Sequence, residues 1–97
     1  MKNIEEIKKI LMERKNELKD KYGVKEIGVF GSYVTETQTA KSDIDILIEF
    51  QKTVDLLTFV HIKHYLSDLI GAQVDLVMKK TLKPNIGKKI LNQVIYI

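Results

Sequence analysis

Two aspartates stand two residues apart at the start of an alternating apolar segment, in the order Asp43-Ile44-Asp45. In a β-strand, residues two apart point to the same face and lie about 6 to 7 Å apart along the backbone, so both carboxylates can reach the same cations. Two carboxylates this close repel each other unless positive charge lies between them. Oxygen ligands suit Mg²⁺, which usually keeps coordination positions for water and for substrate phosphates. The pair therefore indicates a site for a metal ion bound to a nucleotide.

Two further features accompany this pair. Gly31-Ser32 follows a short apolar segment, and a glycine at such a place lets backbone amides approach a phosphate while the serine hydroxyl donates a further hydrogen bond. Asp75 interrupts the apolar run 74–78, where a buried charge is costly unless it is paired or bound to a metal. Each feature alone has an ordinary explanation, a turn for Gly31-Ser32 and a water-facing edge strand for Asp75. Together they make a candidate phosphate and metal site.

The elements that must position these residues follow from the hydrophobic pattern. Apolar residues at helical spacing predict helices over 4–22, over 56–70 and from Pro84 onward, the first capped by Asn3 and ended by Gly23. Short apolar or alternating segments predict strands at 27–30, 43–50, 73–78 and 94–97, with a loop over 35–42. The pairing direction of the first two strands stays open, because the loop between them permits several topologies.

This order of helices and strands predicts a small mixed β-sheet with helices packed against it, an α/β (α+β) fold. The 97 residues suffice for one globular unit, so we expect a single domain over residues 1–97. A domain of this size holds one core and little beyond it. A partner protein would therefore have to provide part of any elaborate substrate site.

Composition excludes several classes of protein. The chain has no cysteine, which excludes disulfides and thiolate metal sites and suits an intracellular protein. No apolar run approaches the roughly 18 residues that span a bilayer, and acids near the start argue against a signal peptide, so we expect a cytoplasmic protein and no membrane partner.

The 16 Lys and Arg exceed the 13 Asp and Glu, with a basic segment after Asp75. Because no recognition motif accompanies those lysines, direct nucleic-acid binding ranks low.

The layout of Gly31-Ser32, ten intervening residues, Asp43-x-Asp45 and a later single Asp75 resembles the nucleotidyltransferase superfamily of the polymerase-beta type. The flanking segments 42–50 and 74–77 resemble its smallest branch, the minimal nucleotidyltransferases. The resemblance is close over residues 27–78 and extends, through Pro84 and the following helix, to most of the remainder. It implies a nucleotidyltransferase-like fold.

Many members of this branch are antitoxins of two-gene modules whose toxin is a HEPN-type ribonuclease, and they transfer AMP from ATP to a tyrosine of that toxin. The resemblance implies the same for this chain: a protein adenylyltransferase antitoxin with ATP as co-substrate, two Mg²⁺ ions as cofactor and a HEPN-type toxin as substrate and partner. By position it implies that Asp43 and Asp45 ligate Mg²⁺ and that Asp75 completes the metal site or helps to deprotonate the attacking hydroxyl. It also implies that Gly31 and Ser32 hold the triphosphate.

One segment departs from the family pattern. Close relatives commonly continue the Gly-Ser pair with a segment containing Ala-Arg-Gly, whereas residues 33–36 here read Tyr-Val-Thr-Glu. The change removes a cation near the phosphates and adds an acid, and Lys41, Lys79 and Lys80 are the candidates to replace that cation. A second hypothesis therefore stands beside the enzyme: an antitoxin with weak or no catalytic activity that neutralises its toxin by binding alone.

Overall fold

The structure, a computed structural model, describes residues 3–39 and 41–97. Its helices are α1 (Ile4–Tyr22), α2 (Ser32–Thr35), α3 (Leu56–Ile70) and α4 (Pro84–Gln93), with a short 3₁₀ helix η1 (Lys79–Thr81). Its strands are β1 (Val24–Phe30), β2 (Ile44–Phe50), β3 (Val74–Met78) and β4 (Ile95–Tyr96). The three helices and four strands expected from the sequence are all present, in the expected order.

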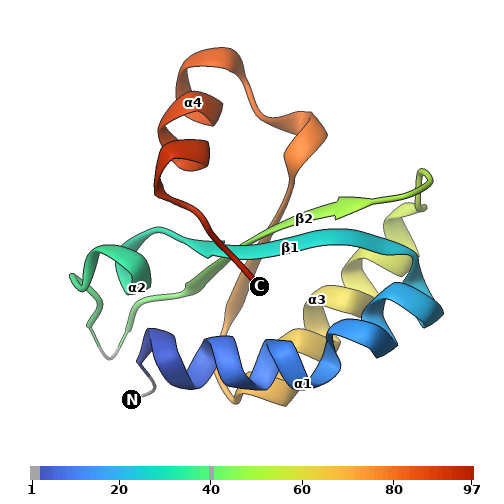
Figure 1. Cartoon of the computed structure of the whole chain (residues 1–97), viewed down its shortest axis with the longest axis horizontal. Coiled ribbons are helices and arrows are strands. Elements are labelled where there is room, and N and C mark those ends of the chain that lie inside the picture. The colour runs from blue at the N-terminus through green and yellow to red at the C-terminus, as the bar shows by residue number, and fades with distance from the viewer. Residues whose placement is uncertain (1–2, 40) are drawn as a thin grey trace.

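The strands form one mixed sheet in the order β3-β2-β1-β4. Strand β1 runs antiparallel to both β2 and β4, which settles the direction that the sequence left open, and β2 runs parallel to β3. Helices α1 and α3 cover one face of the sheet, and α4 stands on the opposite side (Figure 1). The mixed sheet with packed helices is confirmed. No helix in the described part of the chain is long and apolar enough to cross a membrane.

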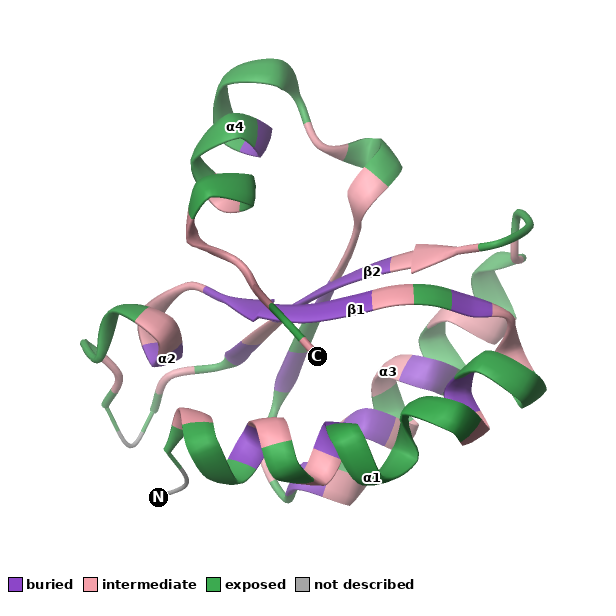
Figure 2. Ribbon diagram, in the orientation of Figure 1, coloured by how far each residue is buried: buried purple, intermediate pink, exposed green. Residues whose placement is uncertain are grey.

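The hydrophobic core lies between the sheet and the helices α1 and α3. Ile44, Ile46 and Ile48 on β2 are fully buried, because strand alternation points all three toward these helices. The buried residues of α1 and α3 face the sheet, while the outer surfaces of both helices are exposed (Figure 2). Burying one Ile or Leu side chain stabilises a fold by about 1.5 to 3 kcal/mol, so this core fixes the sheet on which the candidate site lies.

The predicted helix ends are confirmed in detail. The Asn3 side chain accepts a hydrogen bond of 3.0 Å from the backbone N–H of Glu6, as an N-cap does. Gly23 ends α1 with a left-handed φ of 68°, and Gly71 ends α3 in the same way. Pro84 is the first residue of α4, where its missing N–H costs nothing.

Three elements differ from the sequence-based expectation. Strand β1 begins at Val24 instead of Ile27, because its backbone pairs with the end of β2 from Val24, opposite Phe50, onward. Residues 32–35 form the helix α2 where a loop was expected to begin. The last strand, β4, is only two residues long.

Candidate active site

Three strand ends meet at one edge of the sheet. Strand β1 ends there at Phe30, while β2 and β3 begin there at Ile44 and Val74. Because β1 is antiparallel to β2, and β2 is parallel to β3, Phe30 pairs with Asp45 and Asp45 pairs with Asp75. The topology therefore places two of the predicted aspartates next to each other, beside the predicted Gly31-Ser32 turn.

Asp45 and Asp75 are direct neighbours in the parallel pairing of β2 and β3. Neighbouring strands lie about 4.8 Å apart and paired residues share a face of the sheet, so the two carboxylates are close. The pKa of Asp45 rises from 3.8 to about 6. Partial burial is the main cause, followed by the negative charge of Asp75 with a hydrogen bond to it, and then by the charge of Asp43. The structure therefore concentrates negative charge at this edge.

Asp43 lies one residue before β2 and is exposed. Its charge is the smallest of the influences that raise the pKa of Asp45. Within residues 3–39 and 41–97, no three His, Cys, Asp or Glu side chains are grouped so that they alone could hold a metal ion. The three-carboxylate metal site expected from the sequence stays a prediction, with two of its three members side by side.

Gly31 packs directly against the side chain of Asp45. Its φ of 79° and ψ of −152° suit glycine, and a Cβ atom at this position would collide with the Asp45 carboxylate. Ser32 follows as the first residue of α2 and is half-buried. Both predicted phosphate-binding residues therefore adjoin Asp45. The glycine is required by the space that the aspartate occupies as well as by its backbone conformation.

One residue of this site was not predicted from the sequence. The backbone N–H of Gly31 donates a hydrogen bond of 2.9 Å to Oε1 of Gln93, the last residue of α4. The two residues are 62 positions apart, and glutamine belongs to no motif in this chain. Only the pairing of β4 with β1, which the sequence did not specify, could have pointed to it.

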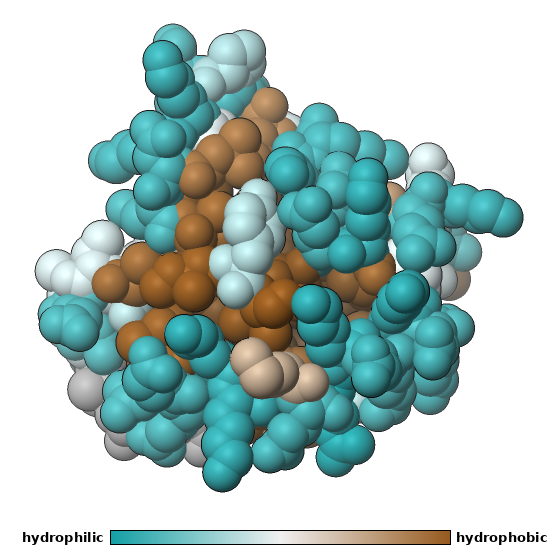
Figure 3. Space-filling model, viewed as in Figure 1, coloured by the Kyte–Doolittle hydropathy of each residue, from teal (hydrophilic) through white to brown (hydrophobic). Residues whose placement is uncertain are grey.

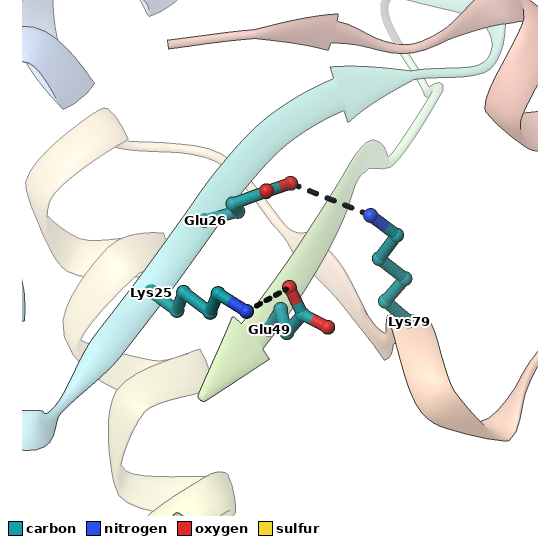
Figure 4. Close-up of polar contacts among 4 residues, drawn as sticks. All are labelled: Lys25, Glu26, Glu49 and Lys79. Atoms are coloured by element: carbon teal, nitrogen blue, oxygen red, sulfur yellow. Dashed lines mark hydrogen bonds and ion pairs between the residues drawn. The ribbon is translucent and has the colours of Figure 1, made fainter. Parts of the chain in front are cut away.

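Two of the lysines named as replacements for the missing arginine, Lys79 and Lys80, do not lie at this edge. Lys79 pairs with Glu26 at 3.4 Å, and Lys80 donates to Thr53 at 3.4 Å. Figure 4 shows Lys79 on Glu26 beside the second ion pair of the sheet, Lys25 with Glu49 at 4.0 Å. Lys79 is the first residue of η1 and follows Asp75 by four residues, about 13 Å in the direction of β3. Lys79 and Lys80 are therefore surface lysines away from the aspartates, and neither replaces the missing cation.

A surface hollow of about 180 Å³ also lies at that other end of the sheet, lined by residues that include Phe50, Lys52 and Lys80. The aspartates do not line it. The remaining candidate, Lys41, is exposed two residues before Asp43.

The arrangement suits a divalent cation that arrives with its nucleotide. None of the ion pairs found within the described residues involves Asp43, Asp45 or Asp75, so the described structure supplies no side-chain cation to offset their charge. Mg²⁺ usually takes one or two carboxylates from a protein and its remaining ligands from water and substrate phosphates. Asp45 and Asp75 supply such a pair, with Asp43 within electrostatic reach.

Comparison with known proteins agrees with this geometry. The family model described as a nucleotidyltransferase domain matches residues 11–97. The chain is 47% identical to the protein adenylyltransferase MntA of Thermococcus cleftensis, over all of this chain and 98% of that protein. It is 54% identical, over the full length of both, to MJ0128 of Methanocaldococcus jannaschii, which is provisionally named a protein adenylyltransferase.

Solved structures share the fold. One described provisionally as a minimal nucleotidyltransferase has a TM-score of 0.74 and 27% identity, covering 92% of this chain and 93% of that one. A toxin-antitoxin structure with AMP-PNP has a TM-score of 0.72 and 24% identity, with 87% and 69% covered. A complex of tri-AMPylated Shewanella oneidensis HEPN toxin with MNT antitoxin has a TM-score of 0.68 and 21% identity, with 93% and 70% covered. The chain belongs to the nucleotidyltransferase domain family, in its minimal, MntA-like branch.

Proposed function

We propose that this chain is a Mg²⁺-dependent protein adenylyltransferase that transfers AMP from ATP to a tyrosine of a HEPN-type toxin and thereby acts as its antitoxin. The observation that carries the proposal is the in-register pairing of Asp45 with Asp75 beside Gly31. The 47% identity to MntA, a protein adenylyltransferase, extends over nearly the full length of both chains and supports the reaction class. Two proteins of the same fold, solved with AMP-PNP and with an AMPylated HEPN toxin, support the nucleotide and the partner.

In the proposed reaction, the tyrosine oxygen attacks the α-phosphorus of ATP. A phosphorus–oxygen bond to tyrosine forms, the bond to pyrophosphate breaks, and the hydroxyl proton leaves to a nearby base. Asp75, exposed at the edge of the sheet, is available to accept that proton or to complete the metal site. Asp43 and Asp45 would hold Mg²⁺, which supplies charge neutralisation when bound. Ser32 would hold the triphosphate through its hydroxyl and backbone, and Gly31, whose own N–H donates to Gln93, would leave room for the phosphates because it has no side chain. A cytoplasmic setting, where ATP is available, is part of the proposal.

The reaction is tested with ATP labelled at the α-phosphate, Mg²⁺ and a HEPN-type toxin as the acceptor protein. We expect label on the toxin with the wild-type chain and none with Asp45→Asn. Asp20→Asn, an exposed change on α1, is the matched control and should retain full transfer. No transfer by the wild-type chain, under conditions in which MntA labels its own toxin, would end the catalytic proposal.

A second function is favoured by one observation. Glu36, exposed at the end of α2, adds a negative charge four residues after Ser32, where it opposes the binding of a triphosphate. An antitoxin with this site could act by binding alone. The two functions separate in cells that express the toxin: if the double variant Asp43→Asn with Asp45→Asn still protects growth, binding suffices, and if protection is lost while complex formation persists, chemistry is required.

A further inference from the structure

The C-terminal segment reaches the candidate site through one side chain. Gln93 Oε1 accepts a 2.9 Å hydrogen bond from the backbone N–H of Gly31, in partly buried surroundings. A partly buried N–H without an acceptor destabilises the fold, because it has lost its hydrogen bond to water and gained none in return. The contact with Gln93 therefore restrains the turn that begins at Gly31.

The sheet register explains why Gln93 stands there. Gly28 pairs with Tyr96 and Val29 with Ile95 in the antiparallel pairing of β1 with β4. Continuing that register by two residues brings Gly31 opposite Gln93. Because Gln93 is the last residue of α4, its side-chain oxygen takes the place that a backbone oxygen would have in a longer strand. The side chain therefore extends the β1–β4 ladder to Gly31.

The approach of β4 is itself specified by a glycine. A Cβ atom on Gly28 would lie 2.9 Å from the backbone oxygen of Ile95 and 2.7 Å from Cγ2 of Val94. Beyond these residues, the N–H of Ile97 donates to the oxygen of Ile27 at 2.9 Å. Apolar side chains gather over β1 and around the base of α4 in this region (Figure 3). The segment that carries Gln93 is thus held firmly on β1.

Gly31 lies between two groups that leave it little freedom. The Asp45 carboxylate occupies the space beside its Cα, and Gln93 holds its N–H. We propose that Gln93 is a positioning residue for nucleotide binding, which keeps the Gly31-Ser32 turn in the one conformation that packs against Asp45. This inference rests on the proposed function, because it assigns that turn to the triphosphate. Gln93 itself need not touch the nucleotide.

The test compares Gln93→Met, which keeps the side-chain length but removes the acceptor, with Asn92→Met, an exposed change on the preceding residue. The first readout is hydrogen exchange of the Gly31 amide, followed by NMR in the nucleotide-free protein. We expect exchange at least tenfold faster in Gln93→Met and unchanged in Asn92→Met. The amide of Ile97 should stay protected in both variants, which shows that β4 is still paired.

The second readout is the dissociation constant of AMP-PNP with Mg²⁺, together with the Michaelis constant for ATP. We expect both constants to rise about tenfold in Gln93→Met, which is about 1.4 kcal/mol, while the Michaelis constant for the toxin is unchanged. If the wild-type chain and Gln93→Met bind AMP-PNP equally well, the assignment of Gln93 is overturned and the proposed function stands. If the wild-type chain does not bind AMP-PNP at all, both are overturned.

Discussion

Asp45 is paired with Asp75 across adjacent parallel strands, and the ion pairs of the described structure bring no cation to either carboxylate. Such an arrangement is unfavourable for the fold without a bound metal ion, because it confines like charges in a partly buried place. The negative charge of Asp45 therefore lowers the free energy of unfolding of the metal-free protein, although the proposed reaction requires that charge.

We expect Asp45→Asn to stabilise the metal-free protein at neutral pH while it abolishes AMP transfer. The pKa of Asp45 is raised from its ordinary value of 3.8 to about 6 in the folded protein, first by partial burial and then by Asp75 and Asp43. Without solvent screening, this difference in pKa corresponds to about 3 kcal/mol in the free energy of unfolding. Screening at a half-exposed site reduces that value to about 1 to 2 kcal/mol. Urea unfolding without Mg²⁺ gives the free energy of unfolding of both proteins.

The sign of the pH dependence follows from the raised pKa. The folded protein binds the Asp45 proton more tightly than the unfolded chain, so wild-type stability contributed by this group falls as pH rises from about 4 to about 6. The advantage of Asp45→Asn should be near zero at pH 4 and complete by pH 7. Asp20→Asn, exposed on α1, should not reproduce this trend. An advantage that is the same at every pH would contradict the assigned cause.

Removal of the metal ion should abolish nucleotide binding. At AMP-PNP a hundredfold above its dissociation constant, binding to the folded state stabilises the protein by about 2.7 kcal/mol. We expect this gain in thermal unfolding experiments with Mg²⁺, and its loss on adding EDTA. Asp45→Asn should show little gain under either condition, because its Mg²⁺ ligand is lost. Equal stabilisation with and without EDTA would argue against a metal ion at this site.

The sequence allowed the sheet and its main helices to be predicted because their patterns repeat over many residues. The alternation over Asp43–Phe50 fixes which face is buried, and that face carries Ile44, Ile46 and Ile48 in the core. The helix α1 was predictable to the residue, since Asn3 and Gly23 cap it by local chemistry. Local rules of this kind need no knowledge of the rest of the chain.

The site was predictable only in part, because its assembly depends on strand pairing. Spacing and family resemblance identified Asp45 and Asp75, yet their adjacency arises from the parallel pairing that the crossover through α3 permits. The contact of Gln93 with Gly31 joins residues 62 positions apart and uses a side chain that any exposed helix could carry. No periodicity or motif encodes such a contact.

We expect Gly31→Ala to destabilise the protein strongly and to abolish activity. Its φ of 79° with a ψ of −152° lies in a region open essentially to glycine and costs about 1 to 3 kcal/mol for alanine, and the collision with the Asp45 carboxylate adds about 1 to 3 kcal/mol. Gly71→Ala is the control for a positive φ without a collision, since Gly71 also has a φ of 79° but a ψ of 28°, in the ordinary left-handed region, and nothing within 4 Å of an added Cβ. Urea unfolding compares the two variants. Equal losses of stability would show that Asp45 does not restrict Gly31.

We expect Gly28→Ala to detach β4 and to reproduce the effect of Gln93→Met on Gly31. A Cβ atom 2.9 Å from a backbone oxygen of β4 forces the strand to move, at a cost of about 1 to 3 kcal/mol. Hydrogen exchange of the Ile97 and Gly31 amides should accelerate together, because β4 lies between Gln93 and Ile97 and holds both residues against β1. Lys25→Ala, an exposed change in the same strand, is the control. If only the Ile97 amide responds, the position of Gln93 does not depend on β4.

We expect Glu36→Gly to stabilise the protein and to favour nucleotide binding. Glu36 ends α2 with a φ of 59°, and it is the non-glycine residue with positive φ in the described chain. Relief of that strain, about 1 to 2 kcal/mol, exceeds the added entropy of the unfolded chain, so the net gain is about 0.5 to 1 kcal/mol. For a domain of this size the midpoint of thermal unfolding should rise by about 3 to 6 °C.

Glu36→Ala removes the same charge and leaves the strain, so it should match Glu36→Gly in AMP-PNP affinity but not in stability. If both variants are equally stable, the left-handed conformation of Glu36 carries no strain, and the acid alone accounts for any change in this segment.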